Sequence, residues 1–518
     1  MNLGIDLIIV LFLASLIVGV LILVVGVLFH IVPGLKEFWL SKPLVLRKWF
    51  FYQFVGLSLL GVIIFALSIP IKSMMELEDW VIDGVMSGYQ ENIPSINARE
   101  IPPFVLLDID NKTHISWGEP SYTPRDKLKN LIDTAVQAKA RLIIVDIDIS
   151  KSPLTKNGPL PDDLVLAKYL KNYATKCKQN QSDCSPIILV RAFSYDATSK
   201  SNLLTPRIGF FEDVVTQSFP YVQWGMAELI LSIATKQTRR WSLWEATCTK
   251  EQQPGVIPSM ALLTMGIIRG CGKYGEEIRN TLDSLKPENC SQFLPPESIN
   301  FCGLTTSTNI DSVQQRIMYR MPYSPAPATV HDNQGDTVLT ILSAKPYAEE
   351  SPPPDSLEVF NDSVVVIGGS YGPLGCPPAG NDIHCTPIGE MPGALVIINA
   401  IYSLLQDLTI KPVSYWWLVI AFVIIITLFS LIPEKPDKTV IHEQPNNPWY
   451  KTIIWWLIII IVVGLFIYSF ILFEDGTWLD IAVPVAIIAI CQKIYQLKWP
   501  KKMANKVLAT TERADNTN

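Results

Sequence analysis

The chain has 518 residues, of which 49% are hydrophobic and 17% are charged, and its formal net charge at pH 7 is −6. Basic side chains are not clustered with aromatic ones in the long central segment, which argues against a nucleic-acid-binding protein. That segment, residues 73–412, is long enough to bury a substantial hydrophobic core.

Two long hydrophobic stretches open the chain, at residues 7–32 and 50–71. A bilayer core of roughly 30 Å needs about 20 apolar residues per helix, so each stretch is predicted to cross a membrane. The first stretch has no basic residue before it and no small-residue cleavage site after it, so we expect a retained helix rather than a signal peptide. The loop between the two stretches is basic, which predicts a cytoplasmic location for it.

The central segment alternates apolar runs with stretches of helical periodicity. Near-continuous apolar strands that alternate with helices imply a mostly parallel sheet covered on both faces, and therefore an α/β fold. The expected strands are 104–110, 142–149, 187–193 and 364–369, and the expected helices are 125–140, 163–174 and 393–405.

Eight of the nine cysteines lie in this segment, which predicts a domain exported to an oxidising compartment. The sequence has no C-x-x-C pair and only five histidines, so we expect no metal site. Eight cysteines allow 105 pairings, and sequence spacing alone ranks them. The spacing most favours Cys177–Cys184 and Cys376–Cys385, and then Cys248–Cys271 and Cys290–Cys302.

Three further hydrophobic stretches follow, at residues 415–432, 453–473 and 481–494. Together with the first two they predict an α-helical transmembrane bundle of five spans beside the α/β domain. An odd number of spans places the basic tail and the basic first loop on the same side, which should be the cytoplasm. The expected organisation is two transmembrane helices with a basic cytoplasmic loop (1–72), an exterior domain (73–412), three transmembrane helices (413–496) and a short basic cytoplasmic tail (497–518).

Polar side chains occur at the carboxyl ends of the expected strands, where parallel sheets bind ligands. Clustered carboxylates hold a hard cation such as calcium, or a cationic ligand. We expect Asp108 and Asp146 to lie on adjacent strands, roughly 5 Å apart at the backbone. The alternative is structural, in which these two carboxylates cap helices or pair with Arg125 and Arg191. The candidate ligand-binding residues are Asp108, Asp110, Asp146, Asp148, Arg191, Ser370, Asp382 and His384.

Two other sequence patterns are weaker indications of a binding or catalytic site. The run Gly368-Gly369-Ser370 offers backbone N–H groups to an anion, as glycines that open a helix do. His384 stands beside Cys385, but a cysteine held in a disulfide cannot act as a nucleophile. The sequence contains neither G-x-S-x-G nor H-E-x-x-H, so we expect no catalytic residue and no cofactor.

Short motifs that occur in a fixed order carry a resemblance to a known family. They are Leu107-Asp-Ile-Asp110 with Arg125 and Ile144-Val-Asp-Ile147; Gly225 with Arg239, Arg240 and Ile257-Pro-Ser-Met-Ala261; and Val364-Val-Val-Ile-Gly-Gly369 with Asp382-Ile-His384, Thr386-Pro387, Met391-Pro-Gly393 and Asn399-Ala400. In this order they resemble the CHASE domain of the second type, an extracellular sensory module of bacterial receptors. The resemblance covers nearly the whole central segment and implies three helices after the sensor.

The chain also departs from that family's pattern. Ile397 and Ile398 stand where the family commonly has a histidine, just before the Asn-Ala pair of the last helix. Family members usually have one span before the sensor and continue into a kinase or cyclase, whereas here two stretches precede it. Residues 497–518 follow the last stretch, so we expect the output to reside on a separate protein.

The resemblance implies a membrane-anchored extracytoplasmic sensory or binding subunit that acts through a separate partner protein. The alternative is a structural or assembly subunit of a bacterial envelope complex that uses the same fold without ligand sensing. We expect no enzymatic activity. The expected partners are other membrane or envelope proteins, in a homo- or hetero-oligomer, and an unknown small ligand. The expected location is the bacterial inner membrane, as a multi-pass protein with the large domain in the periplasm.

Overall fold

A computed structural model describes most of the central segment and little of the rest. The described residues are 72–88, 101–150, 159–180, 184–194, 203–232, 235–290, 295–308, 315–349, 357–372, 382–406, 411–412, 463–464, 467–468, 471–472 and 477–478. The chain divides into two compact units, one formed by Asp83–Ile410 and the other by Met1–Ile82 with Lys411–Asn518. We call the first unit the sheet domain.

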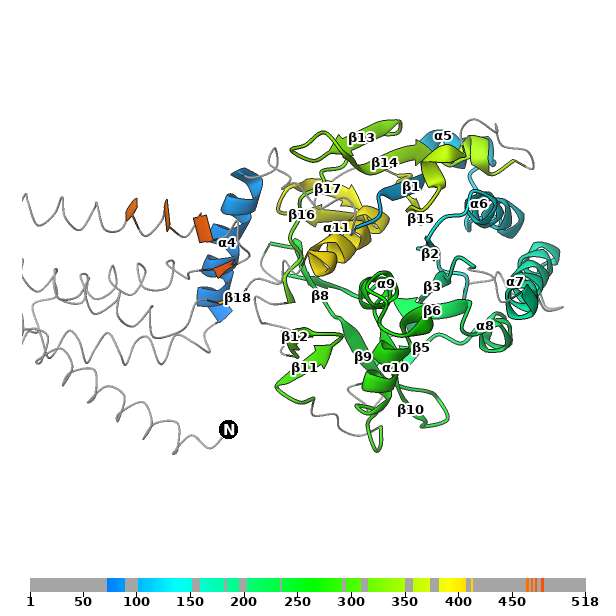
Figure 1. Cartoon of the computed structure of the whole chain (residues 1–518), viewed down its shortest axis with the longest axis horizontal. Helices are drawn as coiled ribbons and strands as arrows, with labels where there is room; N and C mark the ends of the chain where they lie inside the picture. The colour runs from blue at the N-terminus through cyan, green and yellow to red at the C-terminus, as the bar shows by residue number, and fades with distance from the viewer. Residues whose placement is uncertain are drawn as a thin grey trace, which may run out of the picture. The chain divides into compact units, whose positions relative to one another are not determined.

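A seven-stranded sheet is the centre of the sheet domain (Figure 1). In spatial order its strands are β13 (Ala328–His331), β14 (Thr337–Ser343), β1 (Phe104–Ile109), β15 (Val364–Gly369), β2 (Leu142–Val145), β3 (Ile187–Arg191) and β6 (Val222–Met226). All neighbouring strands pair in parallel except β13, which pairs antiparallel with β14. The three central strands are apolar runs with every residue buried, as expected for strands covered on both faces. The predicted α/β fold with a mostly parallel sheet is therefore confirmed.

Helices cover both faces of this sheet (Figure 1). They are α6 (Arg125–Gln137), α7 (Pro161–Asn180), α8 (Glu212–Ser218), α9 (Met260–Ile268) and α11 (Gly393–Leu405). One face packs against α6, α7 and α8, where Val105 and Leu107 share a hydrophobic core with Leu128 and Leu166. The other face carries α9 and α11. Every residue of α11 is buried, since the helix is mostly apolar and the polar groups of Asn399 and Ser403 are hydrogen-bonded inside the domain.

The other described elements are short, except for the 17-residue helix α4. The helices are α4 (Lys72–Gly88), α5 (Asn111–Ser116), α10 (Glu276–Asp283) and the 3-10 turns η1 (Lys273–Gly275), η3 (Lys345–Tyr347) and η5 (Glu358–Phe360). The paired strands are β4 (Phe193–Ser194) with β5 (Thr205–Pro206), β7 (Leu229–Leu231) with β8 (Thr238–Trp241), β9 (Trp244–Cys248) with β10 (Pro254–Pro258), β11 (Ser298–Phe301) with β12 (Leu304–Ser307), β16 (Ile383–Thr386) with β17 (Gly389–Pro392), and β18 (Lys411–Pro412) with β19 (Thr477–Trp478). The boundary between the two units falls within α4, so its residues from Asp83 onward belong to the sheet domain.

The structure corrects the other half of the fold-class prediction. Within the described ranges, no helix combines the length and the apolar character needed to cross a membrane. The five-span bundle is therefore not supported. The five expected spans lie outside the described residues, apart from three short helical pieces within 453–473.

The disulfides follow the prediction only in part. Cys177 at the end of α7 is bonded to Cys184, as predicted, with 5.9 Å between their Cα atoms. Cys385 is also disulfide-bonded, and its expected partner Cys376 lies outside the described residues. The predicted pairs Cys248–Cys271 and Cys290–Cys302 are wrong, because the structure has Cys248–Cys290 and Cys271–Cys302. Between Cys248 and Cys271 the chain forms β10 and then α9, so nearness in sequence did not mean nearness in space.

Candidate ligand-binding site at the strand ends

Three residues at the carboxyl ends of the central strands form a row across the sheet. Asp108 on β1 is in register with Gly368 on β15. The next strand places Asp146 beside Gly368, because Ile367 is in register with Val145 and its carbonyl accepts the Asp146 N–H at 2.8 Å. Side chains of one parity share a face of a strand, and the row faces α11 rather than α6 and α7. We call Asp108, Gly368 and Asp146 the strand-end row.

The row corrects the expected strand order. Asp108 and Asp146 were expected on adjacent strands, but β15 lies between them. The connection through α6 from β1 to β2 leaves one strand position open, and β15, which comes much later in the chain, occupies it. The two carboxylates are therefore two strand spacings apart, roughly 10 Å at the backbone.

Gly368 allows α11 to approach the sheet between these carboxylates. A Cβ atom at Gly368 would overlap the Cβ of Ala394, in the first turn of α11, and would lie 3.7 Å from the Cβ of Asp146. A side chain at this position would therefore push the helix N-terminus away from the row. The N-terminus of a helix carries a partial positive charge, so it is a favourable neighbour for carboxylates.

Asp108 is the most unusual residue of the row. Its side chain is 1% exposed, and its Oδ2 accepts hydrogen bonds from the Ser370 hydroxyl at 2.7 Å and the Tyr323 hydroxyl at 3.4 Å. Its Oδ1 is buried and has no hydrogen-bond partner among the described residues. Burial raises the pKa of Asp108 to about 6, and the negative charge of Asp110 adds to the rise against the lowering by the two hydroxyls. An unsatisfied buried carboxylate oxygen is costly, so it marks a position where a proton or a ligand is expected to bind.

The charge of a second carboxylate, Asp382 beside α11, acts on Asp146. Burial, followed by the negative charge of Asp382, raises the pKa of Asp146 well above its ordinary value. The Asp382 carboxylate lies against Gly393, the first residue of α11, where an added Cβ would come within 2.6 Å of its oxygens. His384 Nε2 lies 3.1 Å from Asp382 Oδ1, and its Nδ1 lies 3.2 Å from the Thr238 hydroxyl. The structure thus brings five of the eight candidate residues to the N-terminal end of α11: Asp108, Ser370, Asp146, Asp382 and His384.

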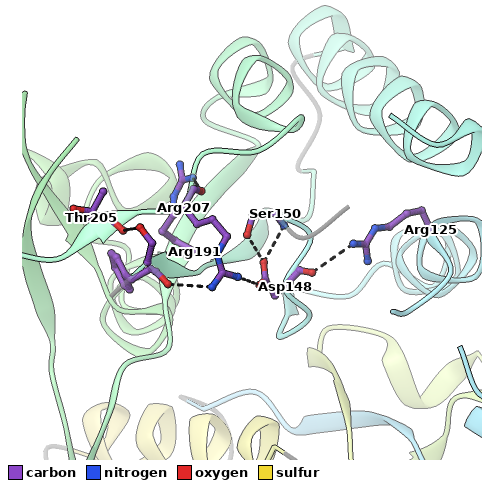
Figure 2. A network of polar contacts seen from close by, with 8 residues as sticks. Arg125, Asp148, Ser150, Arg191, Thr205 and Arg207 are labelled. Carbon is purple, nitrogen blue, oxygen red and sulfur yellow. Dashed lines mark hydrogen bonds and ion pairs between the residues drawn. The ribbon is translucent and has the colours of Figure 1, made fainter. Parts of the chain in front are cut away.

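The other three candidates have structural partners. Asp110 caps α5 by accepting the Thr113 N–H at 2.7 Å. Asp148 accepts from the N–H and hydroxyl of Ser150 and pairs with Arg207 (Figure 2). Arg191 forms a two-pronged ion pair with Glu212 and lies over the ring of Trp224 at 4.1 Å.

The alternative in which Asp108 and Asp146 cap helices or pair with Arg125 and Arg191 is wrong. Arg125 pairs with Asp163, and Arg191 pairs with Glu212, so neither arginine forms an ion pair with Asp108 or Asp146. Both carboxylates also lack the N-cap geometry that Asp110 shows.

The anion interpretation of Gly368-Gly369-Ser370 is also wrong. The two glycines end β15 instead of opening a helix, and Gly368 packs under Ala394. The Ser370 N–H donates to the Ile109 carbonyl at 3.2 Å, and its hydroxyl donates to Asp108. These groups therefore stabilise the strand ends and are not directed at an anion.

A family model described as "CHASE2 domain" matches residues 57–432, which is more than half of the chain. The chain belongs to the CHASE2 domain family. No curated protein and no solved structure matches the chain. CHASE2 domains are extracellular sensory domains, so the family assigns a sensory type of domain to the central segment and an extracellular or periplasmic location to it.

Several residues of this CHASE2 domain were not predicted to matter. Tyr323 donates to Asp108 from a Pro-rich segment with no periodic pattern, so no sequence signal pointed to it. Arg239 and Arg316 are 2% and 1% exposed and both pair with Asp83. Arg239 and Arg240 are among the motif residues that carry the family resemblance, and this was the one available signal for the buried cluster.

The pKa of Asp108 predicts how the stability of the CHASE2 domain depends on pH. Its folded pKa of about 6 lies above the ordinary value of 3.8, so the folded state binds this proton more tightly than the unfolded state. Stability should therefore fall as pH rises from about 4 to above 6, by roughly 2–3 kcal/mol from this group. Asp108→Asn should abolish that component in urea unfolding of the intact chain between these pH values.

Asp362 provides a control, because its pKa is shifted in the opposite direction to that of Asp108. The hydrogen bond from Arg141 lowers the pKa of Asp362, so its contribution to stability is present above the unfolded pKa and is lost as pH falls. Asp362→Asn should change the acid side of the profile only slightly, because this pair is exposed. Parallel pH profiles for Asp108→Asn and the unmodified chain would show that Asp108 does not titrate as described.

Proposed function

We propose that this chain is an extracytoplasmic sensory subunit that binds a small ligand and acts through a separate partner protein. The family match supports the sensory role, and the disulfides of the sheet domain support an oxidising compartment. The hydrophobic stretches of the sequence support attachment to the bacterial inner membrane, with the sheet domain in the periplasm. The proposal assigns no chemical reaction to the chain itself.

The single observation that carries ligand binding is the buried Asp108 beside the N-terminal end of α11. Its Oδ1 has no partner among the described residues, although the residue is 1% exposed. A ligand or a proton that binds to this oxygen would change the charge that faces the first turn of α11. The helix N-terminus is therefore the element that would respond first.

The side chains of α11 connect that response to a second segment of the domain. Asn399 Oδ1 accepts the N–H groups of Arg320 and Met321, both at 2.9 Å, and its Nδ2 donates to the Met321 carbonyl. One turn later, the Ser403 hydroxyl accepts the Met318 N–H at 3.0 Å. Residues 318–321, within the described segment 315–321, are therefore held along α11 by buried hydrogen bonds.

The same segment reaches α4 through a buried ion-pair cluster. Arg316 and Arg239 both pair with the carboxylate of Asp83, and the Ile317 N–H donates to the Arg239 carbonyl at 2.9 Å. Asp83 lies on α4, where the sheet domain begins. A movement of α11 is thereby connected to the helix through which the chain enters the domain.

One observation favours the alternative of a structural or assembly subunit. Ile397 and Ile398 are 4% and 0% exposed, at the positions where the family commonly has a histidine. If that histidine contacts the ligand in other members, its replacement would fit a domain that keeps the fold without sensing. The two proposals differ in what the chain should bind.

Affinity purification of the intact chain after crosslinking in cells tests the proposal. We expect a signalling enzyme, such as a kinase or a cyclase, to co-purify, and we expect Asp146→Asn to change the activity of that enzyme. Asp213→Asn, an exposed carboxylate on α8, is the matched control and should have no effect. Recovery of a stoichiometric envelope assembly without any signalling enzyme would favour the structural alternative.

A further inference from the structure

Among the described residues, Tyr323 supplies the one hydrogen bond that reaches the Asp108 carboxylate from a segment outside the strand ends. Its hydroxyl lies 3.4 Å from Asp108 Oδ2 and 3.1 Å from the Ser370 hydroxyl. The Ser370 hydroxyl in turn donates to the same Oδ2 at 2.7 Å. The three side chains therefore contact one another, and we call them the Asp108 cluster.

The members of this cluster are restrained to different degrees. Ser370 is fixed to the sheet, because its N–H donates to a carbonyl of β1 at 3.2 Å. Tyr323 is half-buried, its backbone forms no hydrogen bond within the described ranges, and the exposed residues 324–325 follow it. On its other side, the N–H groups of residues 320–321 are held by Asn399 of α11. Tyr323 is therefore the member that can move away while the sheet stays in place.

Asp108 has no cation to balance its charge in the described part of the chain. The residues opposite it on β14 and β15 are Ser343 and Gly368, which do not titrate, and α11 places Ala394 against Gly368. The titratable groups that act on it are Asp110, whose negative charge opposes ionisation, and the tyrosine of the cluster. Burial raises the pKa of Asp108 to about 6, so near that pH the carboxyl changes from a neutral form to an ionised one.

The ionised form is the less well satisfied of the two. The hydroxyls of serine and tyrosine both donate and accept, so the cluster can bond to either form of the carboxyl. Asp108 Oδ1 is buried without a partner among the described residues, and a buried charged oxygen without a donor is costly. Water can reach this oxygen only after a neighbouring side chain has moved. Ionisation therefore favours the departure of Tyr323, the least restrained neighbour.

We propose that the Asp108 cluster is a proton-operated switch, which Tyr323 closes while Asp108 is protonated and leaves when Asp108 ionises. Tyr323 continues the segment that Asn399 holds, so opening of the switch loosens residues 318–321 from α11. The inference rests on the proposed sensory function and names the proton as the ligand of the same site.

Electron paramagnetic resonance of the intact chain, with a nitroxide attached at Ser324→Cys, tests the inference. This position is exposed and adjacent to Tyr323. We expect the probe to become more mobile as pH rises, with a midpoint near the Asp108 pKa of about 6. In Asp108→Asn, whose side chain stays neutral, the less mobile spectrum should persist at every pH.

Two controls accompany this measurement. The same label at Asn280→Cys, an exposed position of α10, should show no transition, which separates release of Tyr323 from general loosening of the domain. The unmodified chain, labelled in parallel, corrects for other reactive thiols.

Tyr323→Phe distinguishes the switch from a merely structural contact. The Tyr323 hydroxyl lowers the pKa of Asp108, so its removal should raise the midpoint, by up to about one pH unit. An unchanged midpoint in this variant, no transition between about pH 4.5 and 8, or a transition retained in Asp108→Asn would overturn the inference. If a signalling enzyme co-purifies while the probe shows no transition, the proton is the wrong ligand and the sensory role stands.

Discussion

Asp83→Ala is expected to lower the free energy of unfolding of the sheet domain by about 3–5 kcal/mol. Asp83 is 8% exposed, and its two oxygens accept from the guanidinium groups of Arg239 and Arg316, which are themselves buried. Removal of the shared carboxylate leaves two buried positive charges without the anion between them. Urea unfolding of the intact chain, followed by tryptophan fluorescence, measures the effect.

Asp362→Ala is the matched control for this prediction. Asp362 also forms a two-pronged pair with an arginine, with bonds of 2.7 and 2.6 Å from Arg141, but its side chain is 65% exposed. Exposed ion pairs contribute about 0–1 kcal/mol, so this substitution should have a small effect. Equal losses from the two substitutions would contradict the claim that the Asp83 cluster is a buried structural junction.

Asn399→Ala is expected to destabilise the sheet domain by about 3–4 kcal/mol, because two buried backbone N–H groups lose their side-chain acceptor at about 1–3 kcal/mol each. Asn399 is fully buried, and its Oδ1 accepts from Arg320 and Met321. The same change should loosen residues 315–321 from α11. Asn280→Ala, at an exposed position of α10, controls for the difference in helix propensity.

The result for Asn399→Ala also bears on function. If the segment 315–321 connects α11 to Asp83, this variant should weaken the response of the partner more than its loss of stability explains. A variant that unfolds at the same urea concentration as Asn280→Ala would show that the buried amide is dispensable.

Four strands of the sheet (β1, β2, β3 and β15) and three of its helices (α6, α7 and α11) were predictable because they contain long apolar runs or an apolar stripe with helical spacing. The bounds expected for the strand at 364–369 and the helix at 393–405 match β15 and α11. The strand β6 was not predicted, because Val222–Met226 has a polar glutamine and a glycine inside it. The strand β14 was not predicted either, because the apolar residues of Thr337–Ser343 are mixed with Thr and Ser and the segment lacks regular alternation.

The sequence predicted which strand ends carry the site residues, but not how far apart those residues lie. The rule that ligands bind at carboxyl ends of parallel strands pointed to Asp108 and Asp146. Their separation depends on the insertion of β15 between β1 and β2, which is a long-range pairing that local patterns do not encode. The role of Gly368 depends in turn on where α11 crosses that strand. Charge alone did not separate these residues from Asp110, which caps α5, or from Asp148, which is bonded to Ser150 and paired with Arg207.

The central claim is that the strand-end row is connected through α11 to Asp83. Hydrogen–deuterium exchange on the intact chain, compared between Asp146→Asn and the control Asp213→Asn, tests it most directly. We expect Asp146→Asn to change exchange in the first turns of α11, in residues 315–321 and in residues 83–88, while Asp213→Asn changes none of them. A change confined to the neighbourhood of β2, with α11 and residues 315–321 unaffected, would contradict that connection.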